Sequence, residues 1–476
     1  MIPTFYPLWS ILASHGTSRL FRGFCTFSAL VNRAGFKTKL QSLTYTSVLI
    51  IVITFIASCQ STTKKNVLVV QKNSITNIIE LPKPLPLAKA EYERLNKACQ
   101  HWYDSALLLR GFNGGIIVAK NGNIVFEKYN GTGHLPGNDF ITDSTPLQIA
   151  SVSKTFTAMA VLKLWQDGKL NIDDELSKYL TTFNYPGVTI RTLLNHRSGL
   201  PNYLYFMETL GWDKTKNTTN EDVLDFLITK KGLLPNIAPA DKHFTYCNTN
   251  YALLALLIEN VTGKKFPDFL QQTFFTPLHM KNTFVYNTAD SIKVNLSYDW
   301  RGRLIPLNYL DGVYGDKNIY TTSQDLLIWD RALSSNKIFT AETLAQAYTP
   351  YSNEKPGIKN YGLGWRMNIY PDGKKMIFHN GWWHGSNATF IRLLKENATI
   401  IVIGNKFTRN IYHAKILCDL FGDYYSSEED EENDNTKPID SLTALNTINI
   451  ATQPRLSKKD TKLQQIFKDK NRVKTQ

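Results

Sequence analysis

Charged residues, cysteines and long apolar runs are all scarce in this 476-residue chain, and each scarcity excludes a class of protein. The 20% of charged and 43% of hydrophobic residues exclude a wholly disordered chain and a coiled coil. The apolar run at residues 48–57 has only about ten residues, whereas a membrane-spanning helix needs about 20, which excludes a multi-span membrane protein. The five cysteines are widely spaced without Cys-x-x-Cys, which argues against a disulfide framework and a metal site.

The positive charge is concentrated outside the central region. The net charge of +14 includes +5 from residues 1–58, +3 from residues 59–88 and zero from residues 426–476. The large central region therefore carries +6 and has no dense Lys/Arg run. We expect no nucleic-acid partner, although a basic peripheral membrane or nucleic-acid binder is an alternative based on charge alone.

The N-terminal region has the order of an export signal. Lys37 and Lys39 precede the apolar residues 48–57, which have the length of a secretory h-region. The following Ile56-Ala57-Ser58-Cys59 resembles the lipobox of bacterial lipoproteins, in which the cysteine receives the lipid. The alternative is a buried strand that ends in cysteine. We predict lipidation at Cys59, a membrane contact through the lipid, and a location in the bacterial cell envelope.

Composition divides the chain into four parts. Residues 1–58 are an upstream extension and signal peptide, and residues 59–89 are expected to be a flexible tether. The Pro-rich end of this tether could instead form an ordered strand on the domain surface. Residues 90–424 form the folded body, and residues 425–476 form a charged tail that we expect to be disordered.

Strand patterns lie at both ends of the body and helix patterns lie between them. Asn121-Gly122 separates two β-rich runs, which predicts a hairpin. We expect helices at residues 151–166, 189–195, 249–261 and 411–421, a capping box at Thr322 before another helix, and strands at 375–379, 388–393 and 398–403. The predicted fold class is α/β (α+β): an antiparallel sheet built from the chain termini, flanked by helices, with a mostly helical insertion at about 171–310.

Ser151 and Lys154 form a Ser-x-x-Lys motif at the start of a predicted helix. Residues i and i+3 share a helix face, so the lysine can reach the serine hydroxyl and act as its base. The same pattern occurs at Ser61, Ser334 and Ser352, without a following amphipathic run. The plain alternative is an N-cap serine and a solvated lysine.

Two further motifs carry polar groups suited to a cleft. Tyr246 and Asn248 form a Tyr-x-Asn before a helix, where a phenol can relay protons and an amide can hold a carbonyl. His379 and Gly381 form a His-x-Gly at a strand end, where the glycine would let substrate approach the backbone. The alternatives are a packed tyrosine with a helix-capping asparagine, and an exposed β-turn, which Trp382 and its aromatic neighbours disfavour.

These three motifs, in this order, resemble the serine β-lactamase and penicillin-binding-protein superfamily, and most closely its class C β-lactamase-related group. The resemblance covers about residues 100–422. Four flanking segments support it: PLQIASVSKTFTAMAVLKLWQDGKLNIDDELSKYL, VTIRTLLNHRSGLPNY, GDKNIYTTSQDLLIWDRAL and YGLGW.

The resemblance implies a role for each motif residue. Ser151 would be the acylated nucleophile, Lys154 its base, and Tyr246 the proton relay that also activates the deacylating water. Asn248, His379 and Gly381 would bind substrate. The backbone N–H groups of Ser151 and Trp382 would form the oxyanion hole. No metal or organic cofactor is implied, and the partner is a small-molecule or peptide acyl substrate.

The third motif departs from the pattern of β-lactamases and transpeptidases, which usually have lysine where this chain has His379. A histidine is mostly neutral at pH 7 and does not supply a permanent cation for a substrate carboxylate. We therefore expect a serine hydrolase of esters or amides, including D-amino-acid peptides. The alternatives are a β-lactamase or D,D-carboxypeptidase, and an inactive envelope binding protein on the same fold.

Overall fold

The computed structural model describes residues 78–235, 237–287 and 294–424, which all belong to one compact unit. The predicted signal, Cys59 and the predicted tail at 425–476 lie outside the described residues. Within the described ranges, no helix has both the length and the apolar character that crossing a bilayer requires.

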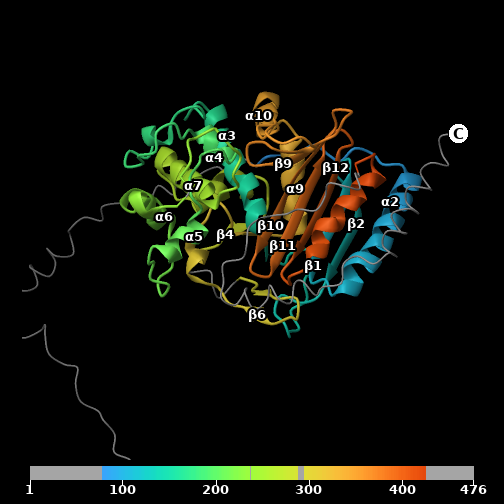
Figure 1. Cartoon of the computed structure of the whole chain (residues 1–476). Helices are drawn as coiled ribbons and strands as arrows, with labels where there is room; N and C mark the ends of the chain where they lie inside the picture. Colours follow the sequence, from blue (N-terminus) through green and yellow to red (C-terminus); the bar gives the residue numbers. More distant parts are fainter. Residues whose placement is uncertain (1–77, 236, 288–293, 425–476) are drawn as a thin grey trace, which may run out of the picture. The chain divides into compact units, whose positions relative to one another are not determined.

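A seven-stranded antiparallel sheet has the order β2-β1-β12-β11-β10-β9-β8 (Figure 1). Its strands are β1 (Gly114–Lys120), β2 (Asn123–Asn130), β8 (Lys359–Tyr361), β9 (Arg366–Ile369), β10 (Lys375–Trp383), β11 (Ser386–Leu393) and β12 (Ala398–Gly404). Asn121 and Gly122 have φ of 56° and 78°, as a tight hairpin turn requires, so the predicted hairpin is confirmed. Because β1 pairs with β12, the two ends of the body meet in mid-sheet, as expected.

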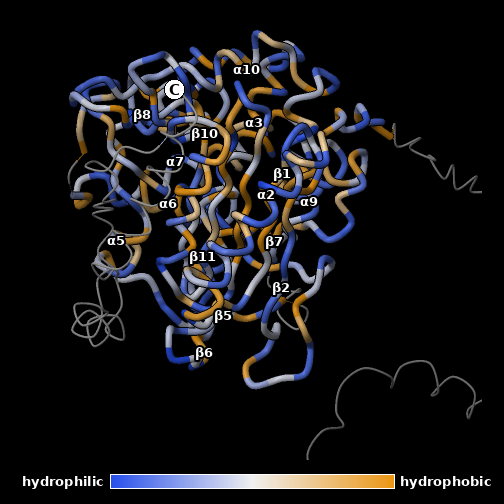
Figure 2. The backbone as a smooth tube through the Cα atoms, turned by 90° about the vertical axis from the view of Figure 1, so that its right-hand side faces the viewer, coloured by the Kyte–Doolittle hydropathy of each residue, from blue (hydrophilic) through white to orange (hydrophobic). Residues whose placement is uncertain are grey.

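Both faces of the sheet are covered, and successive strand residues alternate between two cores. On β1, Ile116 and Val118 pack on the side of helix α2 (Lys89–Trp102) and the 3-10 segment η10 (Arg409–Leu420). Ile117 and Ala119 pack on the opposite side, with the buried helices. Figure 2 shows the hydrophobic stretches gathered inside and the hydrophilic ones at the periphery. The expected helix at 411–421 is present as the 3-10 helix η10.

The chain between β2 and β8 supplies the helices on the second face, and these include the predicted insertion. They are α3 (Ser153–Gln166), α4 (Ile190–Leu194), α5 (Tyr203–Thr209), α6 (Asn220–Thr229), α7 (Asn248–Thr262), α8 (Phe266–Leu270), α9 (Ser323–Leu333) and α10 (Ala341–Ala347). A small sheet of β3 (Leu147–Gln148), β7 (Ile319–Thr321) and β4 (Phe284–Val285) lies among them.

Only one of the two hydrogen bonds of the capping box expected at Thr322 forms. The Thr322 hydroxyl accepts a hydrogen bond from the Asp325 N–H at 3.1 Å, which caps α9. The Asp325 carboxylate does not return to the cap, because it accepts hydrogen bonds from the Asn282 N–H at 2.9 Å and the Thr283 hydroxyl at 2.7 Å. Asp325 therefore joins α9 to the chain before β4.

The described end of the expected flexible tether lies on the body, so the expected boundary at residue 90 is wrong. The Ile79 N–H donates to the Pro277 carbonyl at 2.9 Å, and the Leu85 N–H donates to the Asn121 carbonyl at 3.0 Å. Arg331 on α9 donates to the Pro82 carbonyl at 2.8 Å. Residues 78–88, which we call the N-terminal strap, are thus held on the body by hydrogen bonds to their backbone, although they do not form the strand of the ordered alternative.

Candidate active site

Ser151 lies in a single 3-10 turn, η4 (Ala150–Val152), immediately before α3. The preceding Ala150 is buried with φ of 45°, a left-handed conformation that is uncommon for a residue with a Cβ. Ser151 is half-buried, so its hydroxyl lies at the boundary between core and solvent. Strained backbone of this kind clusters at functional sites.

Lys154 directs its amine at Ser151, as the motif spacing predicted. The Lys154 side chain is fully buried, and its Nζ lies 3.0 Å from the Ser151 Oγ. Nζ also donates to the Asp316 carbonyl at 2.7 Å. Helix α3 is buried around most of its circumference, including its polar residues at 153–157, which explains why Lys154 is shielded from water. The solvated-lysine alternative is therefore wrong.

The loop before α7 brings Tyr246 to the same place. The Lys154 Nζ lies 5.0 Å from the centroid of the Tyr246 ring, and the Arg366 guanidinium carbon lies 5.0 Å from that centroid. Tyr246 is half-buried. The permanent cation of Arg366 beside the phenol ring favours negative charge on that ring.

Asn248 is the first residue of α7 rather than its cap. Cys247 holds the cap position and makes no side-chain capping bond, so the helix-capping alternative for Asn248 is wrong. The structure gives the Asn248 amide no hydrogen-bond partner among the described residues, and the residue is 7% exposed.

His379 on β10 is fully buried behind Tyr246, with the two ring centroids 6.2 Å apart. Its Nδ1–H donates to the Asn380 carbonyl at 2.7 Å, so Nε2 accepts from the Tyr361 hydroxyl at 3.2 Å. Burial, and then the charges of Arg366 and Lys154, hold the pKa of His379 well below its usual value. His379 is therefore neutral at pH 7, and its side chain has no exposed surface, contrary to the exposed-turn alternative.

Gly381 lets β10 approach the nucleophile turn. A Cβ at this position would lie 2.1 Å from the Ile149 carbonyl oxygen, two residues before Ser151. The expected reason for this glycine was close approach of substrate; the structure shows that the protein's own backbone occupies that space. β9 pairs with β10 only up to Phe378, and beyond that point β10 lies beside η4 at Gly381.

Two residues outside the three motifs, His196 and Arg366, also lie beside Tyr246. His196 is fully buried and packs against Tyr246, with the ring centroids 4.3 Å apart and the ring planes at 42°, and its Nδ1 accepts from the Cys247 N–H at 3.2 Å. Arg366 adds a permanent cation. His196 lies in one of the segments that carry the family resemblance and Arg366 directly follows another, but nothing in the spacing of the residues reveals their contacts with Tyr246, because the contacts form only in the fold.

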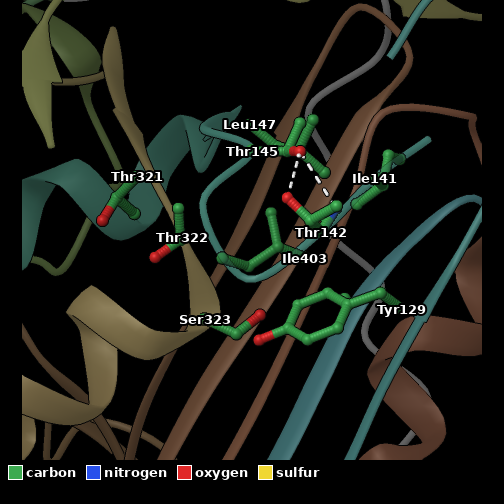
Figure 3. Close-up of a pocket in the computed structure, with 10 residues that line it drawn as sticks. Tyr129, Ile141, Thr142, Thr145, Leu147, Thr321, Thr322, Ser323 and Ile403 are labelled. Carbon is green, nitrogen blue, oxygen red and sulfur yellow. Dashed lines mark hydrogen bonds between the residues drawn. The ribbon is translucent and has the colours of Figure 1, made fainter. Parts of the chain in front are cut away.

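A separate hydroxyl-lined pocket lies between β1, β7 and α9 (Figure 3). Thr142, Thr145 and Tyr129 line it, together with the Ser323 hydroxyl, which is buried without a hydrogen-bond partner among the described residues. None of the motif residues lines this pocket. The described residues also contain no cluster of three or more side chains that could hold a metal ion.

Comparison with known proteins agrees with this geometry. A family model described as Beta-lactamase matches residues 109–415. The chain is 31% identical over 350 residues to Penicillin-binding protein 4* of Bacillus subtilis (strain 168), which covers 69% of this chain and 77% of that protein. It is 28% identical over 307 residues to Protein flp of Staphylococcus aureus (strain MRSA252), which covers 61% of this chain but only 58% of that protein.

Solved structures share the fold. The penicillin-binding protein from Bacillus halodurans gives a TM-score of 0.58 at 24% identity, covering 65% of this chain and 97% of that one. The D-amino acid amidase from Ochrobactrum anthropi SV3, complexed with L-phenylalanine amide, gives 0.56 at 22% identity, covering 69% and 97%. The fold prediction is confirmed, whereas the class C-related subdivision stays a prediction. The chain belongs to the β-lactamase/transpeptidase-like family of serine hydrolases.

Proposed function

We propose that this hydrolase acts on esters or amides through a covalent acyl-Ser151 intermediate. The observation that carries the proposal is the 3.0 Å contact between the Nζ of the fully buried Lys154 and the Oγ of the half-buried Ser151. As a neutral amine, Lys154 accepts the hydroxyl proton while Oγ bonds to the substrate carbonyl carbon. The leaving alcohol or amine departs with a proton, and water then releases the acyl group.

The remaining motif residues take complementary roles. Tyr246, flanked by Lys154 and Arg366, relays the proton to the leaving group and later activates the water. Asn248 orients the substrate. The N–H groups of Ser151 and Trp382 stabilise the oxyanion, and losing one such donor costs about 2.7–4 kcal/mol of transition-state stabilisation.

His379 bears on the substrate class. A neutral, fully buried imidazole supplies no permanent charge for a substrate carboxylate, which supports esters and amides as substrates. D-amino-acid amides are included because a protein of the same fold is a D-amino acid amidase. The assembled contacts around Ser151 weigh against the alternative of an inactive binding protein.

The test is covalent labelling of the enzyme by a fluorophosphonate. We expect one adduct on Ser151 and none in Ser151→Ala. Ser352→Ala is the matched control, because Ser352 has the same Ser-x-x-Lys pattern and should leave labelling unchanged. An adduct that persists in Ser151→Ala, or hydrolysis of p-nitrophenyl esters by that variant at the wild-type rate, contradicts the proposal.

Arg366 supports a second candidate, D,D-carboxypeptidase or β-lactamase activity. It lies beside His379 and Tyr246 and supplies the permanent cation that the third motif lacks. We expect Arg366→Gln to lower kcat/KM for a D-Ala-D-Ala peptide by at least tenfold more than for the same peptide with an amidated C-terminus. Equal losses on the two peptides exclude carboxylate recognition by Arg366, as does a failure of the wild-type enzyme to prefer the free acid.

The location is a separate proposal. Cys59, after its apolar segment, would anchor the body to the bacterial cell envelope through a lipid. Metabolic labelling with a palmitate analogue checks this. Incorporation should disappear in Cys59→Ala, and equal incorporation in that variant contradicts the anchor.

A further inference from the structure

A second buried lysine, Lys317, lies near Lys154. The Lys317 side chain is 3% exposed, and its Nζ lies 3.7 Å from the Asp316 Oδ1. Lys317 also donates to the Val313 carbonyl at 3.2 Å and to the Tyr203 hydroxyl. Burying a charge is unfavourable unless it is paired and hydrogen-bonded, so this arrangement calls for an explanation.

Asp316 connects this second lysine to Lys154, the candidate base. Its carbonyl accepts the hydrogen bond from Lys154 at 2.7 Å, while its carboxylate Oδ2 accepts from the Tyr203 hydroxyl at 3.0 Å. The carboxylate is 2% exposed, and Oδ1 has no hydrogen-bond partner among the described residues, so Lys317 is the cation that pairs with it. The same residue thus positions Lys154 and brings a buried negative charge beside it.

The other titratable groups around the two lysines do not supply the positive charge that balances the Asp316 carboxylate. They are Asp311, His384, His196, His379, Arg366, Cys247, Tyr203, Tyr246 and Tyr251. Asp311 is paired with His384 at 3.0 Å and accepts from the Trp383 indole at 2.6 Å. Burial holds the pKa of both His196 and His379 well below the usual value, so both are neutral at pH 7.

The sign of each charge determines what it does to Lys154. An unpaired Asp316 carboxylate would favour the ammonium form of Lys154, which cannot accept a proton, and an unpaired Lys317 ammonium would favour the neutral amine. Burial lowers the pKa of Lys317 itself, and the carboxylates of Asp316 and Asp311 oppose that effect. Because the Asp316 carboxylate and the Lys317 ammonium are paired, their opposite effects on Lys154 largely cancel.

We propose that Asp316 and Lys317 are a charge-balanced pair of positioning residues: Asp316 holds Lys154 in place, and Lys317 prevents the Asp316 carboxylate from locking Lys154 in its ammonium form. The inference rests on the proposed function, in which Lys154 is the base for Ser151. It extends the working site by two residues that touch neither the acyl group nor the attacking water.

The test uses the pH dependence of kcat/KM for a p-nitrophenyl ester in the full chain. Because the neutral amine of Lys154 is the active form, activity rises with pH as Lys154 loses its proton. Lys317→Met leaves Asp316 unpaired and should move this acid limb to higher pH by about 1 unit or more. Asp316→Asn should move it to lower pH, and the double variant should return it close to the wild-type position.

Opposite shifts separate a charge effect from a loss of structure. Arg392→Met is the matched control, because Arg392 is also a buried cation, paired with Asp330 at 2.5 Å, but in the sheet on β11. Arg392→Met should lower the free energy of unfolding without moving the acid limb of the pH profile of kcat/KM. If Lys317→Met does not fold, the question is decided by whether Asp316→Asn moves the limb to lower pH while the double variant keeps it close to the wild-type position.

The proposal is overturned if the variants lose activity with coincident pH profiles, or if both single variants shift the limb in the same direction. Failure of the proposed function would look different. In that case the wild-type enzyme itself would show no fluorophosphonate adduct on Ser151.

Discussion

Burial sets the protonation state of the two histidines beside Tyr246. His196 and His379 are both fully buried, and for both burial is the largest cause of a pKa well below 6.5. The unfolded chain therefore binds protons at these residues at a pH where the folded chain does not. Their contribution to stability is complete above about pH 6.5 and is lost as the pH falls toward the folded-state pKa.

We therefore predict that the free energy of unfolding falls steeply below pH 6.5. His379→Gln, whose amide oxygen can still accept from Tyr361, should reduce this slope by up to about 1.4 kcal/mol per pH unit, the effect of one proton. Urea denaturation between pH 5 and 8 measures it. His243→Gln is the control, because it makes the same replacement at an exposed histidine. A slope in His379→Gln equal to that of the wild type contradicts the assignment.

At the scale of the elements, local patterns were predictable and contacts between distant segments were not. The hairpin at Asn121-Gly122 and the pairing of Ser151 with Lys154 follow from turn chemistry and helix spacing. The family resemblance gathered the three motifs, but the spacing of the motifs could not place His196 on Tyr246, because tertiary packing alone joins them. The sequence pattern at 411–421 predicted a helix but did not reveal that this helix, η10, has 3-10 geometry.

The contact of β10 with η4 gives a prediction at this scale. Gly381→Ala would put a Cβ 2.1 Å from the Ile149 carbonyl oxygen, and because that oxygen belongs to the backbone, β10 or η4 must move. We expect a loss of roughly 1–3 kcal/mol in stability and a slower fluorophosphonate reaction at Ser151. Gly232→Ala, where a Cβ has nothing within 4 Å, is the control. Wild-type stability and labelling in Gly381→Ala would contradict the close contact.

At the scale of the whole molecule, segments from both ends of the described chain complete one body. β1 and β12 pair in mid-sheet, while the N-terminal strap crosses to the turn after β1 and to α9. Ile79 and Leu81 of the strap pack against the core that holds α3, and Leu87 packs against the core on the other face. The strap therefore contacts both cores, and removing it should weaken the whole body rather than one element.

The contacts of the strap predict different outcomes for two truncations. Residues 78–424 should retain full labelling at Ser151, whereas residues 89–424 should be less stable by roughly 1–3 kcal/mol, because partly buried apolar side chains and backbone hydrogen bonds are lost. Arg331→Ala, which removes the bond to Pro82, should destabilise the first protein and leave the second unchanged, because its partner is absent there. Equal urea midpoints for the two truncations would show that the strap contributes nothing to stability, and an equal effect of Arg331→Ala in both would show that Arg331 acts through other contacts.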